Sequence, residues 1–275
     1  MRTDCPPDPG RSSSRATGVT AGARDRLTDL RSGLADLCAG LTDTFADLAD
    51  LVLPTACAGC RRERVRLRQG ACHECVRQVR ALLPGPVRPT PAPPDLPPCV
   101  ALGPYQGPLR QMLLTYKEQG RHGLARPLGD LLAEVVAAAV GRARPVLVIP
   151  VPATARAARE RHGDHLYRLA RHAVRRLRRA GWPVRLARPV RALPRPDSAA
   201  LDCAARIAVA DAAFRLRPWR TSAVRHAARG RFVVLLDDIV TTGATLAAVT
   251  RQLAVAGVRV DAAALLAATV RRYPQ

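Results

Sequence analysis

Residues 231–246 read RFVVLLDDIVTTGATL, and this stretch decides the fold. An apolar run over residues 232–236 comes directly before two adjacent acids, Asp237 and Asp238. A continuous apolar run is typical of a parallel strand that is buried on both faces. The two acids then lie at the carboxyl end of that strand, where open α/β sheets bind their ligands. The stretch therefore predicts a parallel sheet with a polar site at the end of one of its strands.

A turn rich in threonine and glycine follows the acids and leads into a helical pattern. Its residues are Thr241, Thr242, Gly243, Ala244 and Thr245. The N–H groups and the dipole of a helix N-terminus favour a phosphate, and a glycine lets the backbone approach closely. Acids that suit sugar hydroxyls or a metal, beside a cradle for one phosphate, predict a ribose-5-phosphate site. The alternative is an ordinary strand, loop and helix, but helix capping accounts for only one of the threonines.

The same stretch resembles the 5-phosphoribosyl-1-pyrophosphate (PRPP) signature of type I phosphoribosyltransferases. That signature has four apolar residues, two acids, two apolar residues and T-T-G-x-T, and residues 233–246 match every position. The resemblance implies a type I phosphoribosyltransferase-like parallel sheet flanked by helices. It also implies that Asp237 and Asp238 are the catalytic acids, that residues 241–245 bind PRPP, and that Mg²⁺ accompanies PRPP.

Two C-x-x-C pairs, C-A-G-C and C-H-E-C, lie 11 residues apart and contribute Cys57, Cys60, Cys72 and Cys75. Two such pairs can place four thiolates tetrahedrally around Zn²⁺. A site with four protein ligands is closed, so the zinc would be structural. Disulfides or a redox pair are the alternatives, and a cytosolic setting disfavours structural disulfides.

Composition divides the chain into five segments. We expect a disordered tail over 1–23, an amphipathic helix over 24–53, a zinc-binding module over 54–83, a proline-rich linker over 84–98 and the sheet domain over 99–275. The expected helix carries leucines and aspartates at a spacing of seven. Such a helix either pairs as a coiled coil or docks on its own domain.

This order of segments is similar to the ComF family of competence-related proteins, from about residue 48 to the end. The similar stretches are YQGPLR at 105–110, LLTYK at 113–117, VIPVP at 148–152 and RERHG at 159–163. The stretch VIPVP resembles the V-P-V-P turn of the family, which in related enzymes binds pyrophosphate through backbone amides. The resemblance thus implies that Val151 and Pro152 belong to the PRPP site.

The chain departs from that family in two places. Asp164, His165 and Leu166 stand where the family has F-N-Q. The flexible loop, 198–214, keeps four positions of the family's pattern, Leu201, Arg206, Ala213 and Phe214, and replaces four polar or glycine positions with Ser198, Asp202, Val209 and Ala212. In type I enzymes this loop closes over PRPP and excludes water. We therefore expect ligand binding with slow or absent transfer.

The formal net charge is +22, and the basic excess is concentrated in residues 142–231, which hold 22 arginines against 5 acids. Such a charge attracts nucleic acid or a pyrophosphorylated sugar. A helix expected over 164–180 carries the candidate nucleic-acid contacts, Arg168, Arg171, Arg175 and Arg179. Lys117 is the only lysine, so a compositional preference for arginine explains the excess equally simply.

Two other functions share some of these features. One is a non-catalytic accessory protein for DNA uptake that keeps the fold and binds single-stranded DNA or competence proteins. The other is a glutamine amidophosphoribosyltransferase, which shares the signature. No domain long enough to carry its cysteine nucleophile precedes the expected sheet.

The sequence contains no run of 18 apolar residues, so no membrane span is expected. Residues 1–18 lack the apolar core of a signal peptide. These two observations predict a cytoplasmic protein. They leave the oligomeric state open.

Overall fold

The computed structural model describes residues 56–160, 163–194 and 213–269. The chain divides into two compact units, Met1–Phe45 and Ala46–Gln275, and every described residue belongs to the second unit. The tail and the amphipathic helix expected over residues 1–53 lie outside the described residues.

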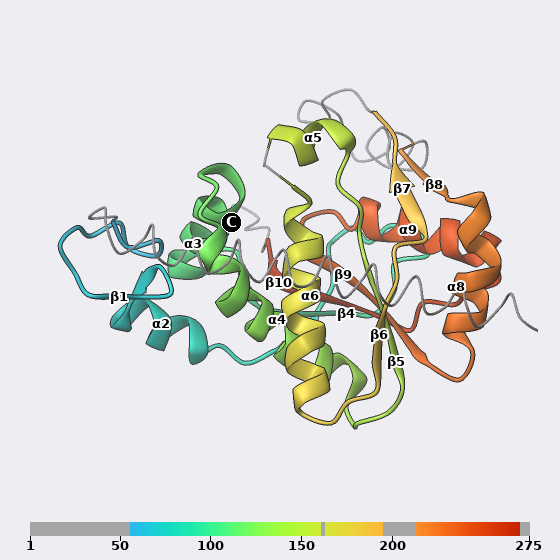
Figure 1. Ribbon diagram of the computed structural model, residues 1–275, viewed down its shortest axis with the longest axis horizontal. Helices are drawn as coiled ribbons and strands as arrows, with labels where there is room; N and C mark the ends of the chain where they lie inside the picture. Colours follow the sequence, from blue (N-terminus) through green and yellow to red (C-terminus); the bar gives the residue numbers. More distant parts are fainter. Residues whose placement is uncertain (1–55, 161–162, 195–212, 270–275) are drawn as a thin grey trace, which may run out of the picture. The chain divides into compact units, whose positions relative to one another are not determined.

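Six strands of the second unit form one mixed sheet in the order β3-β4-β10-β9-β5-β6 (Figure 1). Their bounds are Gly85–Val87 (β3), Cys99–Pro104 (β4), Ala262–Ala268 (β10), Phe232–Val240 (β9), Val146–Pro150 (β5) and Val184–Leu186 (β6). Neighbouring strands are parallel except β3, which is antiparallel to β4. Every residue of β5 and β10 is buried, as parallel strands covered on both faces require. The expected α/β architecture with a mostly parallel sheet is confirmed, and the acids lie in β9, between β10 and β5.

The longer helices among the described residues are α3 (Gly107–Glu118), α4 (Ala125–Val140), α6 (His165–Arg179) and α9 (Ala244–Val255). The chain crosses the sheet in one direction from β4 to β5 and from β5 to β6, and in the opposite direction from β9 to β10. Right-handed crossovers therefore put α4 and α6 on one face and α9 on the other. Helices α4 and α6 pack closely, since a Cβ on Gly129 would lie 2.4 Å from the Cβ of His172.

Strands β5 and β9 are neighbours whose onward connections diverge. After β5 the chain passes to β6, and after β9 it passes to β10 on the other side. Such diverging connections leave a crevice at the carboxyl ends of the two strands. Pro150 of β5 lies opposite Leu236 of β9. The segments that begin at Val151 and Asp237 therefore meet at this crevice.

The proline-rich stretch 84–98 is partly built into the sheet instead of being wholly a linker. Its residues Gly85–Val87 form β3, and Pro86 lies opposite Val100 of β4. An edge strand tolerates proline because the missing N–H faces away from the ladder. Farther along, the backbone oxygen of Pro94 accepts a hydrogen bond from Arg251 of α9 at 3.2 Å.

Smaller elements complete the described part of the unit. They are β1 (Leu67–Arg68), β2 (Ala71–Cys72), α2 (His73–Arg80), the 3-10 turn His122–Leu124, α5 (Ala155–Glu160), β7 (Val190–Ala192), β8 (Phe214–Leu216), the 3-10 turn Pro218–Arg220 and α8 (Thr221–Ala228). β1 pairs antiparallel with β2, and β7 with β8. No helix in the described ranges is both long and apolar enough to cross a membrane.

Candidate functional site

A cleft of about 820 Å³ lies at the carboxyl ends of β5 and β9. It is lined by the loop after β5, the acids of β9, the start of α9, Lys117 at the end of α3, His165 at the start of α6, and Phe214 of β8. Five of the residues predicted for the PRPP site line it: Val151, Pro152, Asp237, Asp238 and Thr245. The other four, residues 241–244, belong to the turn that joins the acids to Thr245 but do not themselves line the cleft.

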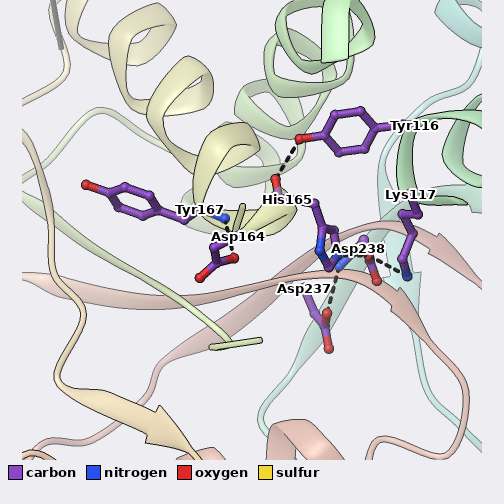
Figure 2. A network of polar contacts seen from close by, with 7 residues as sticks. All are labelled: Tyr116, Lys117, Asp164, His165, Tyr167, Asp237 and Asp238. Atoms are coloured by element: carbon purple, nitrogen blue, oxygen red, sulfur yellow. Dashed lines mark hydrogen bonds and ion pairs between the residues drawn. The ribbon is translucent and has the colours of Figure 1, made fainter. Parts of the chain in front are cut away.

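Asp238 is buried and is bound by two cationic or polar side chains (Figure 2). The amino group of Lys117 lies 2.7 Å from Oδ2 of Asp238. Nε2 of His165 lies 3.0 Å from the same oxygen. Because an ionised carboxylate only accepts hydrogen bonds, Nε2 carries the proton in this contact. The other ring nitrogen, Nδ1, is buried and has no hydrogen-bond partner among the described residues.

The two acids have opposite pKa shifts. Burial, followed by the charge of Asp238, raises the pKa of Asp237 above its usual value. Burial alone would also raise the pKa of Asp238. The charge of Lys117 and the hydrogen bond from His165 outweigh it and hold the pKa of Asp238 below its usual range. In the free protein Asp238 is therefore the ionised member of the pair, and Asp237 keeps its proton to a higher pH.

The turn after β9 has the backbone that a close approach requires. Gly243 precedes α9 in the left-handed region, with φ 77°, which favours glycine. No side chain caps α9 at this residue, and the first backbone bond of the helix runs from the N–H of Ala247 to the oxygen of Gly243. The N–H groups of the first turn thus have no acceptor within the helix. Thr245 stands in this first turn and lines the cleft.

The loop after β5 lines the cleft, but its first two residues offer no free amide. The N–H of Val151 donates to the backbone oxygen of Leu236 at 2.9 Å, and Pro152 has no N–H. In this structure neither residue therefore offers a free backbone amide to a pyrophosphate, so the predicted amide contacts would have to come from later residues of the loop. The reason is the strand register, which uses the amide of Val151 to extend the pairing of β5 with β9. Ala153, Thr154 and Arg156 follow in the loop and also line the cleft.

Sequence reasoning did not single out Lys117 or His165 as site residues. Both are brought to Asp238 by helices that begin or end beside the cleft. Tyr116 supports the arrangement, because its hydroxyl donates to the backbone oxygen of His165 at 2.7 Å (Figure 2). Asp164 caps α6 by accepting from the N–H of Tyr167 at 3.1 Å. Two features of the sequence could have indicated them: Lys117 is the only lysine, and Asp164, His165 and Leu166 stand where the ComF family has F-N-Q.

Most of the flexible loop expected over 198–214 lies outside the described residues. This applies to Ser198, Leu201, Asp202, Arg206, Val209 and Ala212. Ala213 and Phe214 are described; both are buried and line the cleft at the start of β8. The base of this loop therefore borders the same cleft as the acids.

The four cysteines form a compact cluster that could hold a metal ion. The sulfur atoms of Cys57, Cys60, Cys72 and Cys75 all lie within 4.8 Å of one another. Those of Cys60 and Cys72 are 3.8 Å apart, close to the separation of about 3.8 Å that tetrahedral Zn–S bonds of about 2.3 Å give. Four soft thiolates in this arrangement suit Zn²⁺.

The surroundings lower the pKa of two cysteines of the cluster, Cys57 and Cys60, whereas burial raises the pKa of Cys75. Burial alone would raise the pKa of Cys57, but the N–H groups of Cys72 and Gly59 point at its sulfur and lower the pKa. The side chain of Arg62 lowers the pKa of Cys60 to about 6. A Cβ on Gly59 would lie 2.7 Å from the sulfur of Cys75, so this position needs glycine for space. The lowered pKa values of Cys57 and Cys60 favour the thiolate form, which is the form that binds a metal.

The residues between the second pair of cysteines are engaged elsewhere or exposed. Glu74 accepts hydrogen bonds from Arg77 and Gln78, and His73 is exposed. Cys99, which lies outside the two C-x-x-C pairs, is buried in β4, and burial raises the pKa of its thiol to about 11. None of these residues belongs to the four-cysteine cluster.

The arginines proposed for nucleic acid lie along α6. Arg168, Arg171 and Arg175 are half-buried, and only Arg179 of the four is exposed. The guanidinium of Arg168 is hydrogen-bonded to Nδ1 of His122 at 2.6 Å, and Arg171 and Arg175 have partners within the chain as well. Packing and interactions within the chain therefore account for three of these four arginines without a nucleic acid.

Comparison with known proteins adds no assignment. No protein-family model matches the chain, and a search of curated proteins finds no match.

Proposed function

We propose that this protein binds Mg²⁺–PRPP, or a related phosphoribosyl ligand, in the cleft at the ends of β5 and β9. We further propose that it is a ComF-like protein with a type I phosphoribosyltransferase sheet. The observation that carries the proposal is that separate stretches of sequence converge on one cleft. These are the acids of β9, Thr245 at the start of α9, and the loop after β5. Their order around the cleft suits a sugar with a phosphate at one end and a pyrophosphate at the other.

Each part of the ligand then has its own place among the acids, the start of α9 and the loop after β5. The ribose hydroxyls lie against Asp237 and Asp238, which are the only carboxylates lining the described cleft. The 5-phosphate lies at the start of α9, where the helix dipole, N–H groups that have no acceptor within the helix and Thr245 favour it. Of these N–H groups, that of Ala244 donates to the hydroxyl of Thr242 at 3.4 Å in the free protein. The pyrophosphate lies toward residues 153–156, where Arg156 supplies positive charge.

The chemistry that this arrangement supports is displacement of pyrophosphate from the anomeric carbon by a nitrogen nucleophile. The transition state resembles an oxocarbenium ion, and the ionised Asp238 favours the positive charge that develops on the ribose. Adjacent carboxylate oxygens are ligands that Mg²⁺ accepts, and the ion supplies neutralising charge for the leaving pyrophosphate. Lys117 and His165 hold Asp238 in one orientation. The replaced residues of the flexible loop predict slow transfer, since closure over the ligand normally excludes water.

In this proposal the cysteine cluster is a structural zinc site and takes no part in the reaction. A Zn²⁺ ion held by Cys57, Cys60, Cys72 and Cys75 has no open position for a substrate. Its role is to fix the loops that carry the cysteines.

A second candidate function, binding of single-stranded nucleic acid, is favoured by a surface other than α6. Arg191 of β7 and Arg215 of β8 lie directly opposite each other and are both exposed. The two guanidinium groups therefore concentrate positive charge on one exposed surface, which attracts the phosphates of a nucleic acid. Nearby, Nε of Arg217 is buried and has no hydrogen-bond partner among the described residues. Trp219 follows with 68% of its surface exposed, and basic grooves with aromatic side chains bind single strands.

Thermal unfolding in the presence of ligand tests the first function and separates it from the second. A ligand that binds the native state raises the melting temperature. We expect Mg²⁺–PRPP to raise it for the wild type and for Asp130→Asn, which removes a carboxylate of α4 outside the cleft. Asp238→Asn should lose most of the shift. A shift with single-stranded DNA that Trp219→Ala and Arg215→Gln abolish, without any shift from phosphoribosyl ligands, would favour the second function instead.

A further inference from the structure

The last full turn of α3 touches the cysteine cluster and the cleft at the same time. Thr115, Tyr116 and Lys117 are consecutive, and each bonds a different part of the molecule. Oγ1 of Thr115 donates to the backbone oxygen of Ala58 at 3.4 Å. Tyr116 donates to the backbone oxygen of His165, and Lys117 pairs with Asp238. Consecutive helical residues point about 100° apart, so one turn can reach three separate partners.

Further contacts hold the loop around Cys57 against α3 and the residues that follow it. The backbone oxygen of Ala56 accepts a hydrogen bond from Nη1 of Arg121 at 2.6 Å. The oxygen of Ala58 accepts the bond from Thr115. A Cβ on Gly59 would lie 3.3 Å from the Cβ of Pro108, in the first turn of α3. The neighbours of a metal-binding cysteine thus contact both ends of the helix that carries Lys117.

Metal binding and local folding are coupled at such a cluster. The free energy of metal binding at a four-cysteine site contributes to the folding of the segments that carry the ligands. Loss of the ion would allow the backbone of residues 56–60 to move. The hydrogen bonds of Thr115 and Arg121 to this backbone would then weaken.

We infer that the metal centre positions the acid pair of the cleft through α3, so that zinc occupancy and phosphoribosyl binding are coupled. Thr115 is the positioning residue that transmits the coupling: it fixes the turn from which Tyr116 and Lys117 reach His165 and Asp238. The ligand half of this inference rests on the proposed function. Coupling between two binding sites is reciprocal, so the ligand must retain zinc by the same factor by which zinc favours the ligand.

Hydrogen exchange on the full chain tests the metal half without any ligand. In the wild type, removal of zinc should speed amide exchange in residues 56–83, and also in residues 113–119 and 164–168. Thr115→Val should speed exchange in the latter two segments while zinc stays bound, and Thr115→Ser should restore protection. The matched control is Thr250→Val, which deletes a hydroxyl bonded to the oxygen of Leu246 within α9 and should leave all three segments unchanged. Faster exchange confined to 56–83 after zinc removal would overturn the inference.

Equilibrium competition for zinc with a zinc-selective chelator tests the ligand half. Saturating Mg²⁺–PRPP should tighten zinc binding, and so reduce extraction at equilibrium, by about tenfold in the wild type and in Thr115→Ser, within the usual range of coupling between sites. It should have little effect on extraction from Thr115→Val. If PRPP binds the wild type but leaves extraction unchanged, the coupling is disproved and the proposed function stands. If PRPP does not bind at all, the proposed function fails, and hydrogen exchange still decides whether the metal positions the cleft.

Discussion

The amino group of Lys117 lies 2.7 Å from Oδ2 of Asp238, a carboxylate whose side chain is only 7% exposed. The pair joins the end of α3 to the carboxyl end of β9. A buried carboxylate would be costly without a partner, so Lys117 both neutralises and orients Asp238. Lys117 therefore matters to the fold as well as to the site.

Replacing Lys117 by methionine should destabilise the protein by about 3 kcal/mol, the lower end of the cost of breaking a buried ion pair, because Asp238 keeps only the hydrogen bond from His165. Urea unfolding measures this loss. The double variant Lys117→Met with Asp238→Asn should be less destabilised than the sum of the single variants. Arg77→Gln breaks the exposed pair with Glu74 and should change stability little. Additive effects of the two substitutions at the cleft would show that the contact has no energetic weight.

Ligand binding should release a proton from Asp237. Burial and the neighbouring charge of Asp238 raise the pKa of Asp237, and a bound cation favours its ionised form. The affinity for Mg²⁺–PRPP should therefore fall as the pH drops below this raised pKa. The stability of the free protein should fall as the pH rises through it, since the native state then binds more protons than the unfolded state. Calorimetric titrations in two buffers of different ionisation enthalpy measure the released proton. Equal heats in the two buffers would contradict this reading.

Gly243→Val should abolish phosphoribosyl binding. A branched residue at φ 77° is strained by about 1–3 kcal/mol, and its Cβ would lie 2.8 Å from Cδ1 of Leu96. The control is Gly230→Val, at φ 65° with open space around the added Cβ. It shares the backbone strain but lies before β9, outside the turn that joins the acids to Thr245. Both variants should lose stability, but Gly230→Val should still bind in the thermal-shift assay. Normal binding by Gly243→Val would exclude the turn from the site.

The purified protein should contain about one Zn²⁺ per chain, held by the four cysteines. Cys72→Ser should release the ion and loosen residues 56–83, whereas Cys99→Ser, outside the cluster, should retain it. Elemental analysis and circular dichroism give the two readouts. The sheet should remain folded, since its buried strands do not depend on the cluster. A well-folded wild-type protein that never carries metal would disprove the assignment.

The local features of the site could be predicted from the sequence because each lies within a short stretch. The apolar run, the acids and the turn became β9, Gly243 and the start of α9 without any long-range information. The cysteine spacing likewise gave the four members of the cluster. The helix expected over 164–180 is α6, with Asp164 as its cap. Periodicity and capping chemistry are sufficient for features of this kind.

The rest depends on how distant segments meet. Nothing local to Lys117 or His165 says that both contact one oxygen of Asp238, since this follows from the packing of α3 and α6. The use of the Val151 amide by Leu236 follows from strand register. The edge strand β3 was not predicted, because a proline-rich stretch indicates a linker unless the strand that pairs with it is known. Contacts between segments that are distant in the sequence are the part of the cleft that the sequence did not predict.

Isothermal titration calorimetry of the zinc-loaded wild type with Mg²⁺–PRPP, followed by an assay of pyrophosphate release, decides whether the cleft is a phosphoribosyl site. We expect saturable binding at about one site per chain that weakens when Mg²⁺ is omitted. We expect little or no pyrophosphate release with common purine and pyrimidine bases. Absence of binding heat in folded protein with Mg²⁺ present would contradict the claim that the cleft is a phosphoribosyl site. Rapid pyrophosphate release would confirm the site but contradict the expectation that the altered loop slows transfer.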